Sequence, residues 1–180
     1  MTETAASPVH APFRPGAYFV TLVAQASVPP LARIQGEQAT LTVWGEAIRE
    51  EWFRTPELRP YVRLDPAELL IMPNHLHGVI WIAGAALPEA RCSIAPIIHG
   101  LKRTSTRRFQ MMQGNPELQL WQDGHFEHFI RDAFVLHAVH NYLRLNPAHW
   151  SHDLYNPLRR GKDELTQELW AIFRASYEET

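Results

Sequence analysis

Two histidines separated by a single leucine have the residue type and the spacing to bind a metal ion. His75 and His77 lie within an apolar run at residues 69–82. On a β-strand alternate side chains share one face, so both imidazoles would point the same way, with Cβ atoms about 7 Å apart. Both rings can then lean onto one cation, because imidazole nitrogen is a common metal ligand. The pair therefore predicts two ligands of a metal site on a rigid support.

The same pair has a plain structural alternative. A strand near the surface can carry two histidines on its solvent-facing side without any function. The apolar residues on both faces of this run argue for burial instead. Buried ring nitrogens without partners are costly, so we expect something to occupy the nitrogens of His75 and His77.

Tyr142 and Asn146 lie one turn apart, on the same face of a predicted helix at residues 132–146. Asp132 can cap the start of this helix, and Pro147 disfavours helical geometry in the residue before it. A tyrosine on the buried side of a helix is usually a core residue whose hydroxyl has a partner. The helical pattern alone therefore leaves the role of Tyr142 open.

A basic cluster lies on another predicted helix, at residues 93–113. Its four cations are Lys102, Arg103, Arg107 and Arg108, and threonine hydroxyls at positions 104 and 106 share the same side. Cations and hydroxyls are the groups that contact phosphates in protein–DNA interfaces. The alternative is an ordinary solvated helix face. We take the four basic residues as candidate DNA contacts.

Composition limits the class of protein. The 180 residues, 46% of them hydrophobic, suffice for one well-filled domain. The formal net charge of −2 argues against a protein that coats nucleic acid non-specifically. The single cysteine, Cys92, excludes an internal disulfide and indicates a reducing compartment, so we expect a cytoplasmic protein. We expect neither a membrane span nor a secretory signal, because no apolar run is long enough.

The remaining pattern predicts strands that alternate with helices. Apolar and β-branched runs predict strands at residues 17–25, 61–65, 68–72, 75–82 and 125–131. Spacings of three and four residues predict helices at residues 40–55, 93–113, 132–146 and, more briefly, 163–173. Pro73 and Asn74 predict the turn of a hairpin that ends in the histidine strand. The fold class is α+β, a mostly antiparallel sheet with helices packed against it, and no chemistry is predicted for residues 148–180.

Three separated motifs resemble one known family. They are MPNHLHG at residues 72–78, WQDGHFEHFIR at residues 121–131 and YLRLNP at residues 142–147. In this order and spacing they resemble the single-tyrosine HUH transposases, and more narrowly the REP-associated tyrosine transposase branch. The resemblance implies the ferredoxin-like fold of HUH endonucleases, with a catalytic domain at residues 16–150 between a loose leader at 1–15 and an extension at 151–180.

The resemblance also implies a site and a reaction. His75 and His77 would be the HUH ligands of a divalent metal, Mg²⁺ or Mn²⁺, and Tyr142 would be the nucleophile. The third ligand would be Asn146 or His128, although His128 is equally well explained as a hydrogen-bonded tether between the sheet and the last helix. The substrate would be single-stranded DNA that folds into a hairpin, cut through a 5′-phosphotyrosine.

Two other functions and the state of assembly stay open at this point. A nucleotide hydrolase of the histidine-triad kind would need a third histidine at position 79, where Val79 stands. A catalytically inactive or domesticated hairpin-DNA binding protein would keep the same motifs. The sequence does not decide between a monomer and a homodimer, or whether the tyrosine acts within its own subunit.

Overall fold

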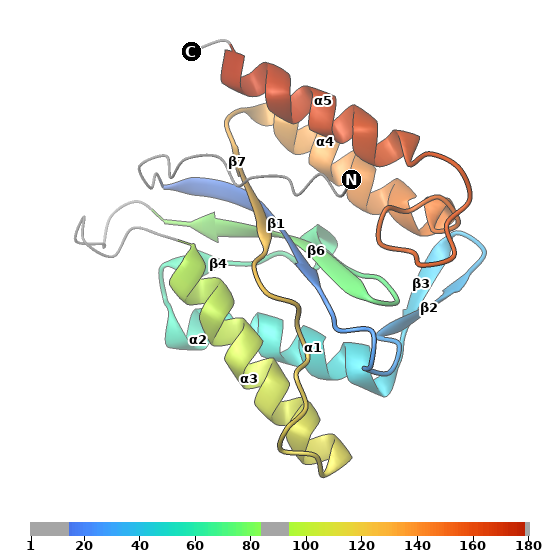
Figure 1. The fold of residues 1–180 in the computed structure, drawn as a ribbon. Helices are drawn as coiled ribbons and strands as arrows, with labels where there is room; N and C mark the ends of the chain where they lie inside the picture. Colours follow the sequence, from blue (N-terminus) through green and yellow to red (C-terminus); the bar gives the residue numbers. More distant parts are fainter. Residues whose placement is uncertain (1–14, 84–93, 179–180) are drawn as a thin grey trace.

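A central antiparallel sheet organises the computed structural model, which describes residues 15–83 and 94–178 (Figure 1). The sheet has five strands in the order β4-β6-β1-β7, and β5 also pairs with β6. The strands are β1 (Gly16–Val23), β4 (Val62–Arg63), β5 (Leu69–Ile71), β6 (His75–Ile82) and β7 (Phe126–Ile130). Every pairing is antiparallel. With helices on both faces, this confirms the predicted α+β class.

The histidine strand β6 pairs with the central strand β1 along its whole length. The register sets Thr21 opposite His77 and Val23 opposite His75. On its other side β6 pairs with β5, and the Met72 N–H donates to the His75 carbonyl at the turn. The predicted hairpin is therefore confirmed. Because opposite residues in a pair share a face, Thr21 lies on the same side of the sheet as His77.

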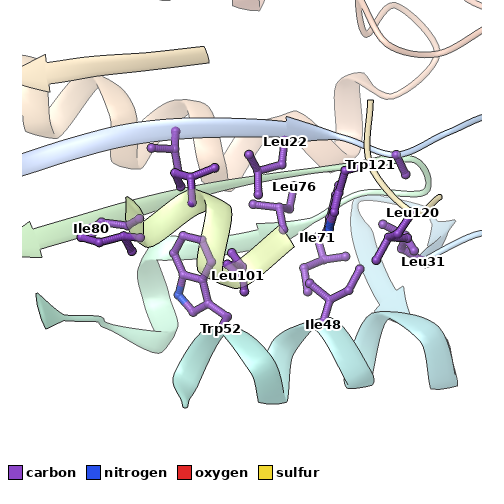
Figure 2. Close-up of a cluster of buried hydrophobic side chains, with 14 of the residues drawn as sticks. Leu22, Leu31, Ile48, Trp52, Ile71, Leu76, Ile80, Leu101, Leu120 and Trp121 are labelled. Atoms are coloured by element: carbon purple, nitrogen blue, oxygen red, sulfur yellow. The ribbon is translucent and has the colours of Figure 1, made fainter. Parts of the chain in front are cut away.

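One face of the sheet is covered by α1 (Val43–Phe53), α2 (Thr55–Leu58) and α3 (Ala95–Gln113) (Figure 1). The Thr42 side chain accepts from the first N–H groups of α1, and Gly114 ends α3 in the left-handed conformation. Figure 2 shows Ile48 and Trp52 of α1 directed at the sheet. They belong to one buried cluster with Leu76 and Ile80 of β6. This layer is the main hydrophobic core.

The opposite face is covered by α4 (Ala133–Leu145) and α5 (Glu164–Glu178) (Figure 1). Asp132 caps α4 by accepting from the Val135 N–H, as predicted. The helix continues into a short 3-10 turn, η3 (Asn146–His149), which contains Pro147. A second buried cluster joins this face to both helices through Phe19, Val79, Val139, Leu143 and Phe173. His75 and His77 point into this layer.

Parts of the structure differ from the predicted elements. A hairpin of β2 (Ala32–Gln35) and β3 (Gln38–Leu41) precedes α1, where no strand was predicted and the helix was expected from Thr40. Gly36 takes a φ of 61° in its turn. Between β4 and β5 lies the 3-10 turn η1 (Pro66–Glu68), and α5 is longer than the helix predicted at 163–173. Ser93, the first residue of the helix predicted at 93–113, lies outside the described residues.

None of the helices in the described ranges combines the length and the apolar character needed to cross a membrane.

Candidate metal centre and nucleophile

The structure brings the two predicted histidine ligands together at one point. The Nε2 atoms of His75 and His77 lie 3.0 Å apart, and both side chains are buried. Each ring is held from behind at its other nitrogen. His75 Nδ1 lies 2.9 Å from Asn74 Oδ1, and His77 Nδ1 lies 2.8 Å from the Thr21 hydroxyl. The two Nε2 atoms therefore converge, which is the arrangement needed for two ligands of one cation.

The protonation state of both rings suits metal binding. The Asn74 amide nitrogen donates to the Tyr155 carbonyl at 2.7 Å, so its oxygen faces His75 and accepts from Nδ1–H. His75 Nε2 then carries a lone pair, which faces His77 Nε2. Burial lowers the pKa of His77 to about 3, and burial together with the charge of His77 lowers the pKa of His75. Both imidazoles are neutral at physiological pH, and neutral imidazole is the form that binds metals.

Asp153 adds a carboxylate to the pair. Its Oδ2 lies 3.7 Å from His75 Nε2, and the ligand atoms of His75, His77 and Asp153 all lie within 4.8 Å of one another. This oxygen is buried and has no hydrogen-bond partner among the described residues. Burial raises the pKa of Asp153 to about 6. A buried carboxylate oxygen without a partner is costly unless a cation pairs with it, so the three residues fit a divalent metal.

Asn146 lies beside this group. It is buried, and its side-chain hydrogen bond to Asp153 lowers the pKa of that carboxyl, against the larger effect of burial. Its Oδ1 atom has no partner in the described part of the chain. A second buried oxygen without a partner thus lies next to Asp153. Asn146 remains a predicted ligand.

His128, the other predicted third ligand, is occupied elsewhere. It lies on β7, and its ring stacks on Phe173 with centroids 3.8 Å apart. Ser176 Oγ lies 3.5 Å from its Nε2 atom. Phe173 and Ser176 both belong to α5, so these contacts match the alternative interpretation of a histidine that tethers the sheet to a helix.

Tyr142 projects from α4 toward the histidine pair. Its hydroxyl lies 3.2 Å from His77 Nε2 and 3.1 Å from the Thr166 hydroxyl. The ring packs edge-on against Phe19 within the second core cluster, and only 3% of the residue is exposed. Burial raises the pKa of Tyr142 above its usual value, so the phenol is protonated at rest. Tyr142 can therefore be both a core residue and the nucleophile, because its ring is buried while its hydroxyl faces His77.

The residues after α4 contribute more to this region than the sequence indicated. Asp153, Tyr155 and Thr166 all lie in the part of the chain for which no chemistry was predicted. The Tyr155 ring lies 4.7 Å from the His75 ring between centroids. Neither the spacing of these residues nor their neighbours marks them as site residues. Their position follows from the packing of α5 on α4, which is a long-range relationship.

The predicted basic cluster divides into two pairs. Arg103 and Arg107 are exposed and have no ionic or hydrogen-bond partner in the described ranges. They line a groove of about 610 Å³ between α3 and residues 119–124. The other two cations are engaged within the fold. Lys102 donates to the Gln122 carbonyl at 2.7 Å and to the Gly124 carbonyl, and Arg108 pairs with Glu50 and Glu51.

Comparison with known proteins supplies the family. No family model matches the chain. An uncharacterized protein of Haemophilus influenzae is 30% identical over 154 residues, which cover 77% of this chain and 83% of that protein. A solved structure of a REP-associated tyrosine transposase bound to a REP hairpin has a TM-score of 0.57 at 17% identity, over 79% of this chain and 73% of the other. This chain therefore belongs to one family with the H. influenzae protein, and it has the fold of the REP-associated tyrosine transposase that its three motifs resemble.

Proposed function

We propose that this protein cuts and rejoins single-stranded, hairpin-forming DNA through a phosphotyrosine intermediate. One observation carries the proposal. The Tyr142 hydroxyl lies 3.2 Å from His77 Nε2, although the two residues are 65 positions apart and lie on different elements. A candidate nucleophile and a candidate metal ligand thus meet within one subunit. The solved transposase of the same fold is bound to a REP hairpin, which supports hairpin DNA as the substrate.

His75, His77 and Asp153 are the proposed metal ligands, and Asn146 is a further candidate. A carboxylate favours Mg²⁺ or Mn²⁺ more than imidazole alone does. A divalent cation bound here would polarise the scissile phosphate and offset the negative charge that builds during an in-line displacement. The chain's own contribution is to keep both imidazoles neutral and aimed at one point. It also leaves the Asp153 Oδ2 atom without a hydrogen-bond partner in the described part of the chain.

Tyr142 is the proposed nucleophile. Its hydroxyl oxygen attacks the phosphorus and gives up its proton, so that a P–O bond forms. The bond to the 3′ oxygen breaks, and that oxygen takes up a proton as it leaves. The products are a 5′-phosphotyrosine and a free 3′-hydroxyl. Because the new ester retains the energy of the phosphodiester, a second hydroxyl can attack it in reverse and rejoin strands without ATP. This is strand transfer, the chemistry of a transposase.

The site is closed in the present conformation. His75, His77 and Tyr142 have exposed fractions of 0%, 2% and 3%. Side chains from beyond α4, among them Trp150 and Tyr155, lie against the His75 ring. A phosphodiester can reach Tyr142 only if this segment moves. The closure is also the observation that favours the second candidate function, a protein that binds hairpin DNA without cutting it.

A covalent-adduct assay separates the two functions. The protein is incubated with labelled single-stranded hairpin DNA, taken from the repeats nearest its gene, and with Mn²⁺. We expect a labelled protein band that persists under denaturing conditions and is absent in Tyr142→Phe. Tyr61 packs against the main hydrophobic core, on the other face of the sheet from the histidines. Tyr61→Phe is therefore the matched control and should form the adduct. Binding without any adduct would support the binding protein instead.

A further inference from the structure

Thr166 of α5 holds the hydroxyl of the proposed nucleophile from the side opposite to His77. Its Oγ1 lies 3.1 Å from the Tyr142 hydroxyl oxygen. Its own hydrogen is donated to Asp163 Oδ2 at 2.7 Å. All three side chains are buried, with exposed fractions of 3% for Tyr142, 7% for Thr166 and 6% for Asp163. None of the three sequence motifs includes Thr166 or Asp163.

We propose that Thr166 and Asp163 are positioning residues that aim the Tyr142 oxygen at the scissile phosphate. The inference rests on the proposed function, since it assigns a role in that same reaction. The argument depends on the direction of the hydrogen bonds. A hydroxyl has one hydrogen, and Thr166 gives its hydrogen to Asp163. Thr166 can then only accept from Tyr142, so the phenol O–H points at α5.

This direction decides which side of the phenol is available for reaction. When the Tyr142 O–H donates to Thr166, the lone pairs of the Tyr142 oxygen face His77 and the other proposed metal ligands. A nucleophile attacks through a lone pair, so the orientation prepares the oxygen before substrate arrives. Without Thr166, no hydrogen bond in the described part of the chain would hold the phenol hydrogen toward α5, and it would be free to rotate to the side that faces His77. The hydrogen would then lie between the oxygen and the place of reaction.

Asp163 keeps Thr166 in this role. Its Oδ1 accepts from the Thr166 N–H at 2.9 Å, and its Oδ2 also accepts from the Leu154 N–H at 2.7 Å. The same carboxylate therefore fixes the start of α5, the Thr166 hydroxyl and the residue after Asp153. This carboxylate therefore continues to accept the Thr166 hydrogen, so Thr166 is not free to donate to Tyr142. Residues beyond α4 thus orient the nucleophile and also supply one of the proposed metal ligands.

The test uses the full chain with a nearly isosteric change. Thr166→Val removes the hydroxyl and keeps the branched shape, whereas Thr166→Ser keeps the hydroxyl. The matched control is Ser176→Ala, which removes another buried hydroxyl of α5, one that donates to the Phe173 carbonyl instead. Two quantities are measured. They are the rate of adduct formation on saturating hairpin DNA, and the ¹³Cζ chemical shift of Tyr142, assigned by its absence in Tyr142→Phe.

The proposal expects adduct formation about tenfold slower or worse in Thr166→Val, the scale of one lost hydrogen bond to the reacting group. Hairpin affinity should be unchanged, and the Tyr142 signal should shift. Thr166→Ser should restore both the rate and the signal, and Ser176→Ala should leave both unchanged. A normal rate or an unmoved Tyr142 signal in Thr166→Val overturns the inference and leaves the proposed function intact. A wild-type protein that binds the hairpin but forms no adduct overturns both.

Discussion

The Nε2 atoms of His75 and His77 lie 3.0 Å apart in a place where neither ring is charged. Two lone pairs at this distance repel, so either a proton or a cation must lie between them. The Thr21 hydroxyl behind His77 can donate or accept, and it therefore permits either tautomer of that ring. A cation that binds both Nε2 atoms would take the place of the shared proton.

The first prediction is that Mn²⁺ binds at this point. His75→Ala or His77→Ala should lower the Mn²⁺ affinity by about tenfold or more, and Asp153→Asn should lower it too, because each change removes a ligand atom. Isothermal titration calorimetry on the DNA-free protein measures the effect. Mn²⁺ should also raise the melting temperature of the wild type, since the metal binds the folded state.

His140 provides the control for this experiment. It is a histidine of α4 whose Nε2 bonds to Glu68 at 2.8 Å, away from the pair. His140→Gln should therefore bind Mn²⁺ as the wild type does. Unchanged affinity in Asp153→Asn would remove that residue from the ligand set and leave Asn146 as the candidate. Unchanged affinity in both histidine variants would place the metal elsewhere.

A second prediction separates the four basic residues of α3. Arg103→Ala combined with Arg107→Ala should weaken hairpin binding and reduce the slope of log affinity against log salt by about two, one for each lost phosphate contact. The reason is that both side chains are exposed and without partners within the described chain. Fluorescence anisotropy at several salt concentrations measures the slope.

Arg108→Ala is the matched control, because its guanidinium already pairs with Glu50 and Glu51 of α1. It should reduce stability modestly and leave the salt slope close to that of the wild type. If changing all of Lys102, Arg103, Arg107 and Arg108 to alanine leaves affinity and slope unchanged, the DNA does not follow α3.

The elements with a strong local pattern could be predicted from the sequence. The histidine hairpin is marked by an apolar run and by Pro73-Asn74, and α4 is marked by Asp132 and Pro147, so both were found close to their observed bounds. The β2–β3 hairpin was missed because its strands are four residues long and half exposed, which leaves little apolar alternation to detect.

The site could be predicted only in part, for a different reason. His75, His77 and Tyr142 lie in short motifs, whereas Asp153 and Thr166 come to them through the packing of α5 on α4. Packing between two helices does not require any fixed spacing in the sequence, so no motif marks these residues. The same applies to Arg108, whose acidic partners lie on another helix more than fifty positions away. Helical periodicity places that arginine on a face but gives no information about which residues meet it.

A third prediction concerns the glycine that follows the second histidine. A Cβ atom at Gly78 would lie 2.6 Å from two ring carbons of Trp52, which is only 1% exposed and has little room to move. Gly78→Ala should therefore lower the free energy of unfolding by about 2 kcal/mol, the usual scale of overpacking. Urea unfolding measures it. In a Trp52→Phe background, where the clashing ring atoms are missing, the same change should cost less, and an equal cost in both backgrounds would refute the steric explanation.

The last prediction is a pH dependence of stability that comes from His128. Burial lowers the pKa of His128 from 6.5 to about 4 in the folded protein. The unfolded chain takes up a proton near pH 6.5, while the folded protein resists it until about pH 4. Stability from this residue is therefore complete above pH 6.5 and is lost as the pH falls toward 4. The loss amounts to no more than about 3 kcal/mol.

His128→Phe isolates this effect, because it keeps a flat ring against Phe173 and cannot take up a proton. Its free energy of unfolding, measured with urea between pH 7 and pH 4.5, should fall less steeply with acid than that of the wild type. A residual slope is expected, because burial lowers the pKa values of His75 and His77 in the same direction. The exposed His137→Gln should reproduce the wild-type profile. Parallel curves for His128→Phe and the wild type would mean that His128 is not held neutral by its burial against α5.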